Sequence, residues 1–173
     1  MSCDPIYQWG VDELRGRIDQ TCEQVLEQTR RNQHEFVWDA IGSVEELGRV
    51  RMAAMEAFLA DYREGRPQGR YVQAELPVLP FDDGQFDLAL CSHLLFLYTH
   101  QLGETLHREA VLELGRVATE VRVFPLLALG GTPSPFVDGC ASVLTQAGYV
   151  VSIEPVPYEF QRGGNQMMRF RKA

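Results

Sequence analysis

Long apolar runs and a secretion signal are missing from this sequence, and their absence narrows the class of protein. No apolar run reaches the roughly 18 residues that a transmembrane helix requires. Met1 is followed by Ser2, Cys3, Asp4 and Pro5, which is not the basic and then apolar pattern of a secretory signal. We therefore expect a cytoplasmic protein that does not insert into a membrane.

Paired cysteines are also missing. The four cysteines lie far apart in the sequence, and none belongs to a C-x-x-C pair: Cys3, Cys22, Cys91 and Cys140. Such pairs are typical of structural zinc sites and of redox-active thiols. The sequence therefore indicates no metal site, and we expect reduced thiols that are mostly buried.

An excess of basic residues is missing as well. Lysine and arginine together number 16 against 24 acidic residues, which gives a formal net charge of -8 and an isoelectric point near 5.0. Proteins that bind nucleic acids concentrate positive charge to match the phosphate backbone. We therefore expect no nucleic-acid partner.

The length and composition are those of a globular domain. The sequence has 173 residues, of which 45% are hydrophobic and 23% are charged. A chain of this length can bury a full hydrophobic core, and its composition is not that of a disordered segment. We expect residues 1–173 to form a single domain built around apolar layers.

Two long amphipathic helices are predicted in the first part of the sequence. In the first helix, apolar side chains such as Leu14 and Ile18 recur at steps of three and four, with charged residues on the other faces. Ser43 and Glu46 form a capping-box pattern, which predicts a second helix that ends near Gly65.

Strands alternate with helices after Gly69. Strands are predicted over 70–76, 86–91, 119–127, 149–154 and 167–171, and helices over 94–98, over 104–117 and from Ser134 to Gly148. This alternation is typical of a doubly wound α/β sheet with helices on both faces. The strand over 86–91 is almost continuously apolar, so we expect it near the centre of the sheet, covered on both faces. The last two strands are expected to pair as an antiparallel hairpin.

The segment from Glu75 to His93 is the most informative in the sequence, and it reads ELPVLPFDDGQFDLALCSH. It resembles class I S-adenosylmethionine-dependent methyltransferases, in which an acid ends the third strand, Leu-Pro-Phe and a turn follow, and Phe-Asp begins the fourth. Here these are Glu75, Leu79 to Phe81, and Phe86 with Asp87. The resemblance extends more weakly over residues 70–172 and implies a Rossmann-like sheet, to which this family adds the terminal antiparallel hairpin.

The resemblance also implies where the cofactor S-adenosylmethionine would bind. Asp4 stands where the family's second strand ends in an acid that accepts hydrogen bonds from the ribose hydroxyls. The two oxygens of a carboxylate match two vicinal hydroxyl donors. Glu75 would lie beside the adenine amino group, Leu76 would also bind the cofactor, and Ser92 and His93 would lie where cofactor and substrate meet.

Each of these assignments has a simpler alternative. Asp4 could be an exposed acid beside a proline turn, Glu75 a surface acid in a loop, and His93 a packing residue. Asp87 more often orders the start of a strand than touches a substrate. Because adjacent strand residues point to opposite faces, we do not interpret Ser92 and His93 as the nucleophile and base of a hydrolase.

The family's glycine-rich turn after the first strand has no counterpart here. Backbone must approach the cofactor closely at that turn, which a side chain would obstruct. Only Met1 to Cys3 precede Asp4, and the pairs Gly130-Gly131 and Gly163-Gly164 follow late strands. In the family, the first strand lies between the second and the fourth, so its absence leaves strand edges unpaired. We expect further residues upstream to supply this strand and turn, and the chain alone to bind the cofactor poorly; the alternative is direct pairing of strands two and four.

The expected function is that of a methyltransferase acting on a small molecule. No catalytic base can be named, because this chemistry mainly needs donor and acceptor to be positioned in line. The alternative is a non-catalytic remnant or interaction module with the same fold.

Residues 6–66 replace a single crossover helix and could form a lid, a substrate wall, a dimer surface or only an enlarged helical layer. Oligomers could form through this insertion or through exposed strand edges. The remaining histidines show no ligand spacing and are expected on the surface or in helices: His34, His100 and His107.

Overall fold

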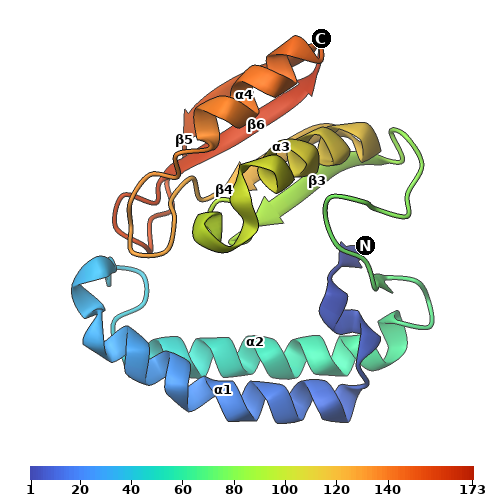
Figure 1. Ribbon diagram of the computed structural model, residues 1–173. Helices are drawn as coiled ribbons and strands as arrows, with labels where there is room; N and C mark the ends of the chain where they lie inside the picture. Colours follow the sequence, from blue (N-terminus) through green and yellow to red (C-terminus); the bar gives the residue numbers. More distant parts are fainter. The chain divides into compact units, whose positions relative to one another are not determined.

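The computed structural model describes residues 1–173, which divide into two compact units, residues 1–75 and residues 76–173 (Figure 1). It contains four α-helices and two β-sheets, so the expected α/β class is confirmed. That the two units form one domain stays a prediction, and each unit is described here by itself.

The first unit is mainly a pair of long helices that lie side by side (Figure 1). Its elements in chain order are β1 (Ser2–Cys3), the 3₁₀ helix η1 (Pro5–Gln8), α1 (Val11–Arg31), the 3₁₀ helix η2 (Gln33–Glu35), α2 (Val44–Gly65) and β2 (Tyr71–Val72). The two long helices expected between residues 6 and 66 are therefore confirmed.

Polar caps define where both helices begin. The Glu13 carboxylate accepts a hydrogen bond from the Gly10 backbone amide at 2.9 Å at the start of α1. At the start of α2, the Ser43 hydroxyl accepts one from the Glu46 amide at 3.1 Å, as the capping-box pattern predicts. The helices approach closely at Gly48, where an added Cβ would lie 2.9 Å from the Leu26 side chain.

An aromatic cluster forms the core of the first unit. Tyr7, Phe58, Tyr62 and Tyr71 stack with ring centroids between 5.1 and 6.2 Å apart. The Tyr62 hydroxyl is buried and lies 3.0 Å from the backbone carbonyls of both Tyr7 and Trp9, between which it shares its one hydrogen. This cluster attaches α2 to the two short strands, which pair in parallel. The strand expected over 70–76 is shorter than predicted, because only Tyr71 and Val72 pair with β1.

The second unit is a four-stranded mixed sheet with two helices. Its elements in chain order are β3 (Phe86–Ser92), α3 (Thr99–Val117), β4 (Ala118–Phe124), α4 (Val137–Gln146), β5 (Tyr149–Pro155) and β6 (Gln166–Lys172). The strand order is β3-β4-β6-β5; β3 and β4 are parallel, and β6 is antiparallel to both of its neighbours. The predicted antiparallel pairing of the last two strands is confirmed.

Both helices of this unit lie on the same face of its sheet (Figure 1). The core between the layers contains inward residues of β4 and β6, such as Val121 and Phe170, against Ala110 and Val111 of α3. Within the second unit, the expectation of helices on both faces is therefore wrong. The alternation of strand and helix predicts which elements form, but it does not predict which face of the sheet each helix covers.

The expected central position of the strand over 86–91 is also wrong for this unit, because β3 is an edge strand. Its Cys91 side chain faces the core, whereas Leu88 and Leu90 are 42% and 69% exposed. The apolar run thus has one face packed under α3 and a second face that no helix of this unit covers.

The starts of two helices also differ from the sequence prediction. Residues 94–98 form turns, and α3 begins at Thr99, with a non-helical Gly103 inside it. Ser134 and Pro135 were expected to open the next helix, but α4 begins at Val137. The Ser134 hydroxyl is buried and is hydrogen-bonded 2.6 Å from that of Thr99.

Candidate functional site

The candidate site is the edge of the second sheet at which β3 and β4 end. The two strands are parallel and in register, so that Ser92 pairs with Phe124. β4 and β5 each pair antiparallel with β6, so β5 runs in the same direction as β4, and the connection over 156–165 lies at the same edge. Ligands of open α/β sheets bind at the carboxyl ends of the strands.

Ser92 and His93 are in direct contact at this edge. The Ser92 hydroxyl and the His93 Nδ1 atom are 2.8 Å apart and hydrogen-bonded. The prediction that the two side chains point to opposite faces is wrong, because His93 has a left-handed backbone with φ of 55° and leaves the strand geometry. In hydrolytic triads the serine faces Nε2 while Nδ1 binds a carboxylate, so this contact does not have triad geometry.

A row of three rings follows from this pair. The His93 backbone amide donates to the Phe124 carbonyl at 2.7 Å, and the two rings meet edge to face with centroids 5.6 Å apart. The Phe124 ring in turn meets Tyr158 at 6.0 Å. Sequence reasoning missed Phe124 and Tyr158, because nothing in the local pattern of either strand end indicates that their rings meet.

Buried hydrogen bonds hold the loops that form this edge. The imidazole of His107 is fully buried, with Nε2 2.8 Å from the Leu95 carbonyl and Nδ1 bonded to the Gly103 carbonyl. His107 was expected on the surface or in a helix; it lies in α3, but its burial was not foreseen. The Leu129 amide donates to the Leu97 carbonyl at 3.0 Å, which joins the loop after β4 to the turn after β3.

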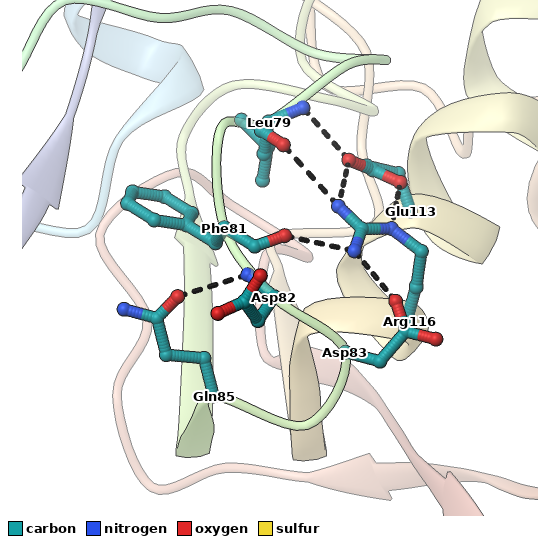
Figure 2. A network of polar contacts seen from close by, with 7 residues as sticks. All are labelled: Leu79, Phe81, Asp82, Asp83, Gln85, Glu113 and Arg116. Carbon is teal, nitrogen blue, oxygen red and sulfur yellow. Dashed lines mark hydrogen bonds and ion pairs between the residues drawn. The ribbon is translucent and has the colours of Figure 1, made fainter.

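The Leu79-Pro80-Phe81 segment that carries the family resemblance is anchored to the end of α3 (Figure 2). Glu113 accepts a hydrogen bond from the Leu79 amide at 2.7 Å. Arg116 donates to the carbonyls of Phe81 and Leu79, at 2.8 and 3.2 Å, and pairs with Asp83 at 2.7 Å. The guanidinium of Arg116 holds the pKa of Glu113 below its ordinary value. This network positions the loop that leads into β3 and explains the motif structurally.

The remaining predicted cofactor residues lie apart from the Ser92 and His93 pair in the chain. Asp4 follows β1 in the first unit; its Oδ1 accepts from the Ile6 amide at 2.9 Å and caps η1. Glu75 is exposed at the end of the first unit. Leu76 is half-buried and packs against the core of the second unit. Their assignment to a cofactor stays a prediction.

No group of three or more histidine, cysteine or acidic side chains is placed to hold a metal ion. Cys91 and Cys140 are buried, as predicted, whereas Cys3 and Cys22 are half-buried. Burial raises the pKa of the Cys140 thiol to about 12.

None of the four helices combines the length and the apolar character needed to cross a membrane.

The two units and this sheet edge define a mixed α/β protein, and comparison with known proteins places it in a family. The chain is 31% identical to the uncharacterized protein MJ0045 of Methanocaldococcus jannaschii over 176 aligned residues, which cover 99% of this chain and 75% of the relative. It therefore belongs to the same family as that archaeal protein. No protein-family profile matches the chain, and no solved structure matches it.

Proposed function

We propose that the protein is an S-adenosylmethionine-dependent methyltransferase with a Rossmann-like sheet, acting on a small molecule. The observation that carries this proposal is the order of the second sheet, in which β6 is inserted antiparallel between β4 and β5. The family resemblance implies such a terminal antiparallel addition to an otherwise parallel sheet. The parallel pairing of β3 with β4 gives further support, because the resembling segment leads directly into β3.

The position of Asp4 supports the assignment of a ribose-binding acid. It directly follows a strand that pairs in parallel with β2, and its amide donates to the Val72 carbonyl at 3.2 Å. Its Oδ1 caps η1, while Oδ2 takes no part in that cap and could accept a hydrogen bond from a ribose hydroxyl. The residues present thus fit the ribose part of the cofactor. The chain contains no glycine-rich turn for the remainder of it.

The cap that Asp4 forms on η1 and the lack of a glycine-rich turn favour a second candidate, a non-catalytic module of this fold. An Asp4 that only caps η1, in a chain without the glycine-rich turn, would have a structural role and no ligand. The two candidates differ in whether the protein binds S-adenosylhomocysteine, the product form of the cofactor.

Isothermal titration of S-adenosylhomocysteine into this chain and into the archaeal relative tests the proposal. The proposal requires the residues of the relative that this chain does not cover to supply the glycine-rich turn, which contributes backbone hydrogen bonds to the cofactor. We therefore expect micromolar binding by the relative and weaker binding by this chain. The proposal is wrong if neither protein binds, and the non-catalytic module then remains.

Two substitutions at Asp4 separate its capping role from a cofactor role. Asp4→Ser keeps an oxygen that can cap the Ile6 amide, whereas Asp4→Ala removes it. If the carboxylate binds the ribose, both variants weaken S-adenosylhomocysteine binding by about 1–3 kcal/mol, while only Asp4→Ala lowers the melting temperature. A change confined to the melting temperature of Asp4→Ala would leave Asp4 with the cap alone. Chemical shifts at high ligand concentration report the weak binding expected of this chain.

A further inference from the structure

Large apolar side chains are exposed in the loops at the carboxyl edge of the second sheet. Leu94, Tyr98, Leu129 and Tyr158 are between 40% and 48% exposed. They come from three separate connections, after β3, after β4 and between β5 and β6. Exposed apolar side chains that gather in one place mark a binding surface more often than scattered ones do.

The connections after β3 and β4 also contain no formal charge. Residues 92–98 and 124–136 include no aspartate, glutamate, lysine or arginine. In the connection between β5 and β6, the Glu159 carboxylate is engaged locally, since it accepts from the Gly163 amide at 2.8 Å and from the Asn165 side chain at 2.9 Å. The same connection contains Arg162, which is likewise engaged in an interaction. The two uncharged connections therefore favour a neutral ligand over a phosphorylated or carboxylated one.

The ring row of His93, Phe124 and Tyr158 gives this surface its shape. Its two contacts are edge to face, with interplanar angles of 76° and 64°. Phe124 lies between the other two rings at the end of β4. The residue before it, Val123, is buried in the core and anchors this end of the strand. Edge-to-face and offset contacts are the arrangements that aromatic rings prefer, so a further flat ring can extend such a row.

A polar pair lies at one end of the row. The Ser92 hydroxyl has one hydrogen atom and two lone pairs, and its contact with His93 Nδ1 uses one of these capacities. The hydroxyl therefore keeps the ability to accept a hydrogen bond from a ligand O–H or N–H group. The site thus combines apolar ring contacts with one polar contact at its end.

We propose that this edge binds the methyl acceptor, and that the acceptor is a neutral, flat aromatic molecule bearing a hydroxyl or amino group next to Ser92. This substrate class rests on the proposed methyltransferase function. The ring row contacts the aromatic part of the acceptor, and Ser92 positions the group that receives the methyl.

Binding of 2-naphthol by the full chain tests this inference, with chemical shifts of backbone amides at the edge as the measurement. Three probes of related shape are matched to it: trans-2-decalol, which is not aromatic, 2-methoxynaphthalene, which cannot donate a hydrogen bond, and naphthalene-2-sulfonate, which is anionic. We expect 2-naphthol to bind more tightly than all three. Equal or tighter binding of the decalol or of the sulfonate would overturn the proposed substrate class.

Two variants assign the binding to these residues. Tyr158→Leu should weaken 2-naphthol binding roughly fivefold, because it removes a ring contact and keeps an apolar side chain. Ser92→Ala should abolish the preference for 2-naphthol over 2-methoxynaphthalene. The control Val150→Ala changes an exposed side chain near the start of β5, away from the edge, and should leave binding unchanged. Binding that is unaffected by both Tyr158→Leu and Ser92→Ala would overturn the site.

Titration of S-adenosylhomocysteine into this chain and into the archaeal relative separates this inference from the proposed function. If neither protein binds it while 2-naphthol binding depends on Tyr158 and Ser92, the methyltransferase proposal fails and the aromatic site stands. If S-adenosylhomocysteine binds and 2-naphthol does not, the proposed function stands and the aromatic acceptor is wrong.

Discussion

The hydroxyls of Thr99 and Ser134 lie 2.6 Å apart and are both buried, so that their hydrogen bond joins the start of α3 to the loop after β4. Thr99 also donates to the Phe96 carbonyl at 2.6 Å, which leaves Ser134 as the donor between the two hydroxyls. The bond holds together two of the three connections that form the candidate site.

A double-mutant cycle measures this bond. Thr99→Val removes the acceptor and leaves the Ser134 hydroxyl buried without it, which should cost about 1–3 kcal/mol of unfolding free energy. Ser134→Ala removes the donor while Thr99 keeps its bond to Phe96, so it should cost about 0.5–1.5 kcal/mol. The double variant should cost less than the sum of the two, as measured by urea unfolding. Strict additivity would mean that the two hydroxyls are not coupled.

Two glycines in helices should respond to alanine in opposite directions. An added Cβ at Gly115 would lie 2.7 Å from the Tyr149 ring, so Gly115→Ala should destabilise the protein by about 1–3 kcal/mol. A Cβ added at Gly16 in α1 would meet no atom within 4 Å beyond the backbone of its own helix, so Gly16→Ala should stabilise the protein by about 0.5–1 kcal/mol. Thermal unfolding distinguishes the two, and a stabilising Gly115→Ala would contradict the close contact between α3 and β5.

Glu120 on β4 should remain ionised in strong acid. Hydrogen bonds from Arg169 and then Arg122 lower its pKa from 4.5 to about 2. Because the folded-state pKa is depressed, the stabilisation from this group is complete above the unfolded pKa and is lost as the pH falls from about 4.5 toward 2. The side-chain carboxyl carbon shift of Glu120 reports the titration. Arg169→Ala should raise this pKa, whereas an unchanged value would show that Arg169 does not interact with it.

Thiol labelling should separate the four cysteines into two classes. Burial raises the pKa of both Cys91 and Cys140, so neither forms appreciable thiolate near pH 8 and neither is accessible. Ellman's reagent should therefore react first with Cys3 and Cys22, which are half-buried. Reaction of all four at one rate in the native protein would contradict this packing.

Local patterns in the sequence predicted the elements well. Apolar spacing and the Ser43 cap located both long helices, and turn signals located β4, β5 and β6 within a few residues. These signals act over a few neighbouring residues and are strong wherever one face of an element is buried. The short β2 was overestimated, because the length of a strand depends on its partner, and β1 has only two residues.

The candidate site was harder to predict because it depends on contacts between distant residues. The motif indicates Ser92 and His93, but their hydrogen bond depends on the left-handed backbone of His93, which no sequence pattern predicts. The contact of Phe124 with Tyr158 joins the last residue of β4 to a residue in the connection between β5 and β6. His107 can be buried because the carbonyls of Gly103, in its own helix, and of Leu95, in the turn after β3, lie beside its ring, and no helical periodicity reveals that.

The interior position of β6 also affects how the protein is made. Residues 166–172 separate β4 from β5, and these two strands do not pair with each other. During synthesis, β4 and β5 leave the ribosome before the strand that joins them exists. The four-stranded order can therefore be completed only after residues 166–172 emerge, and until then the edges of β4 and β5 that β6 will pair with are open, as strand edges are in folding intermediates that aggregate.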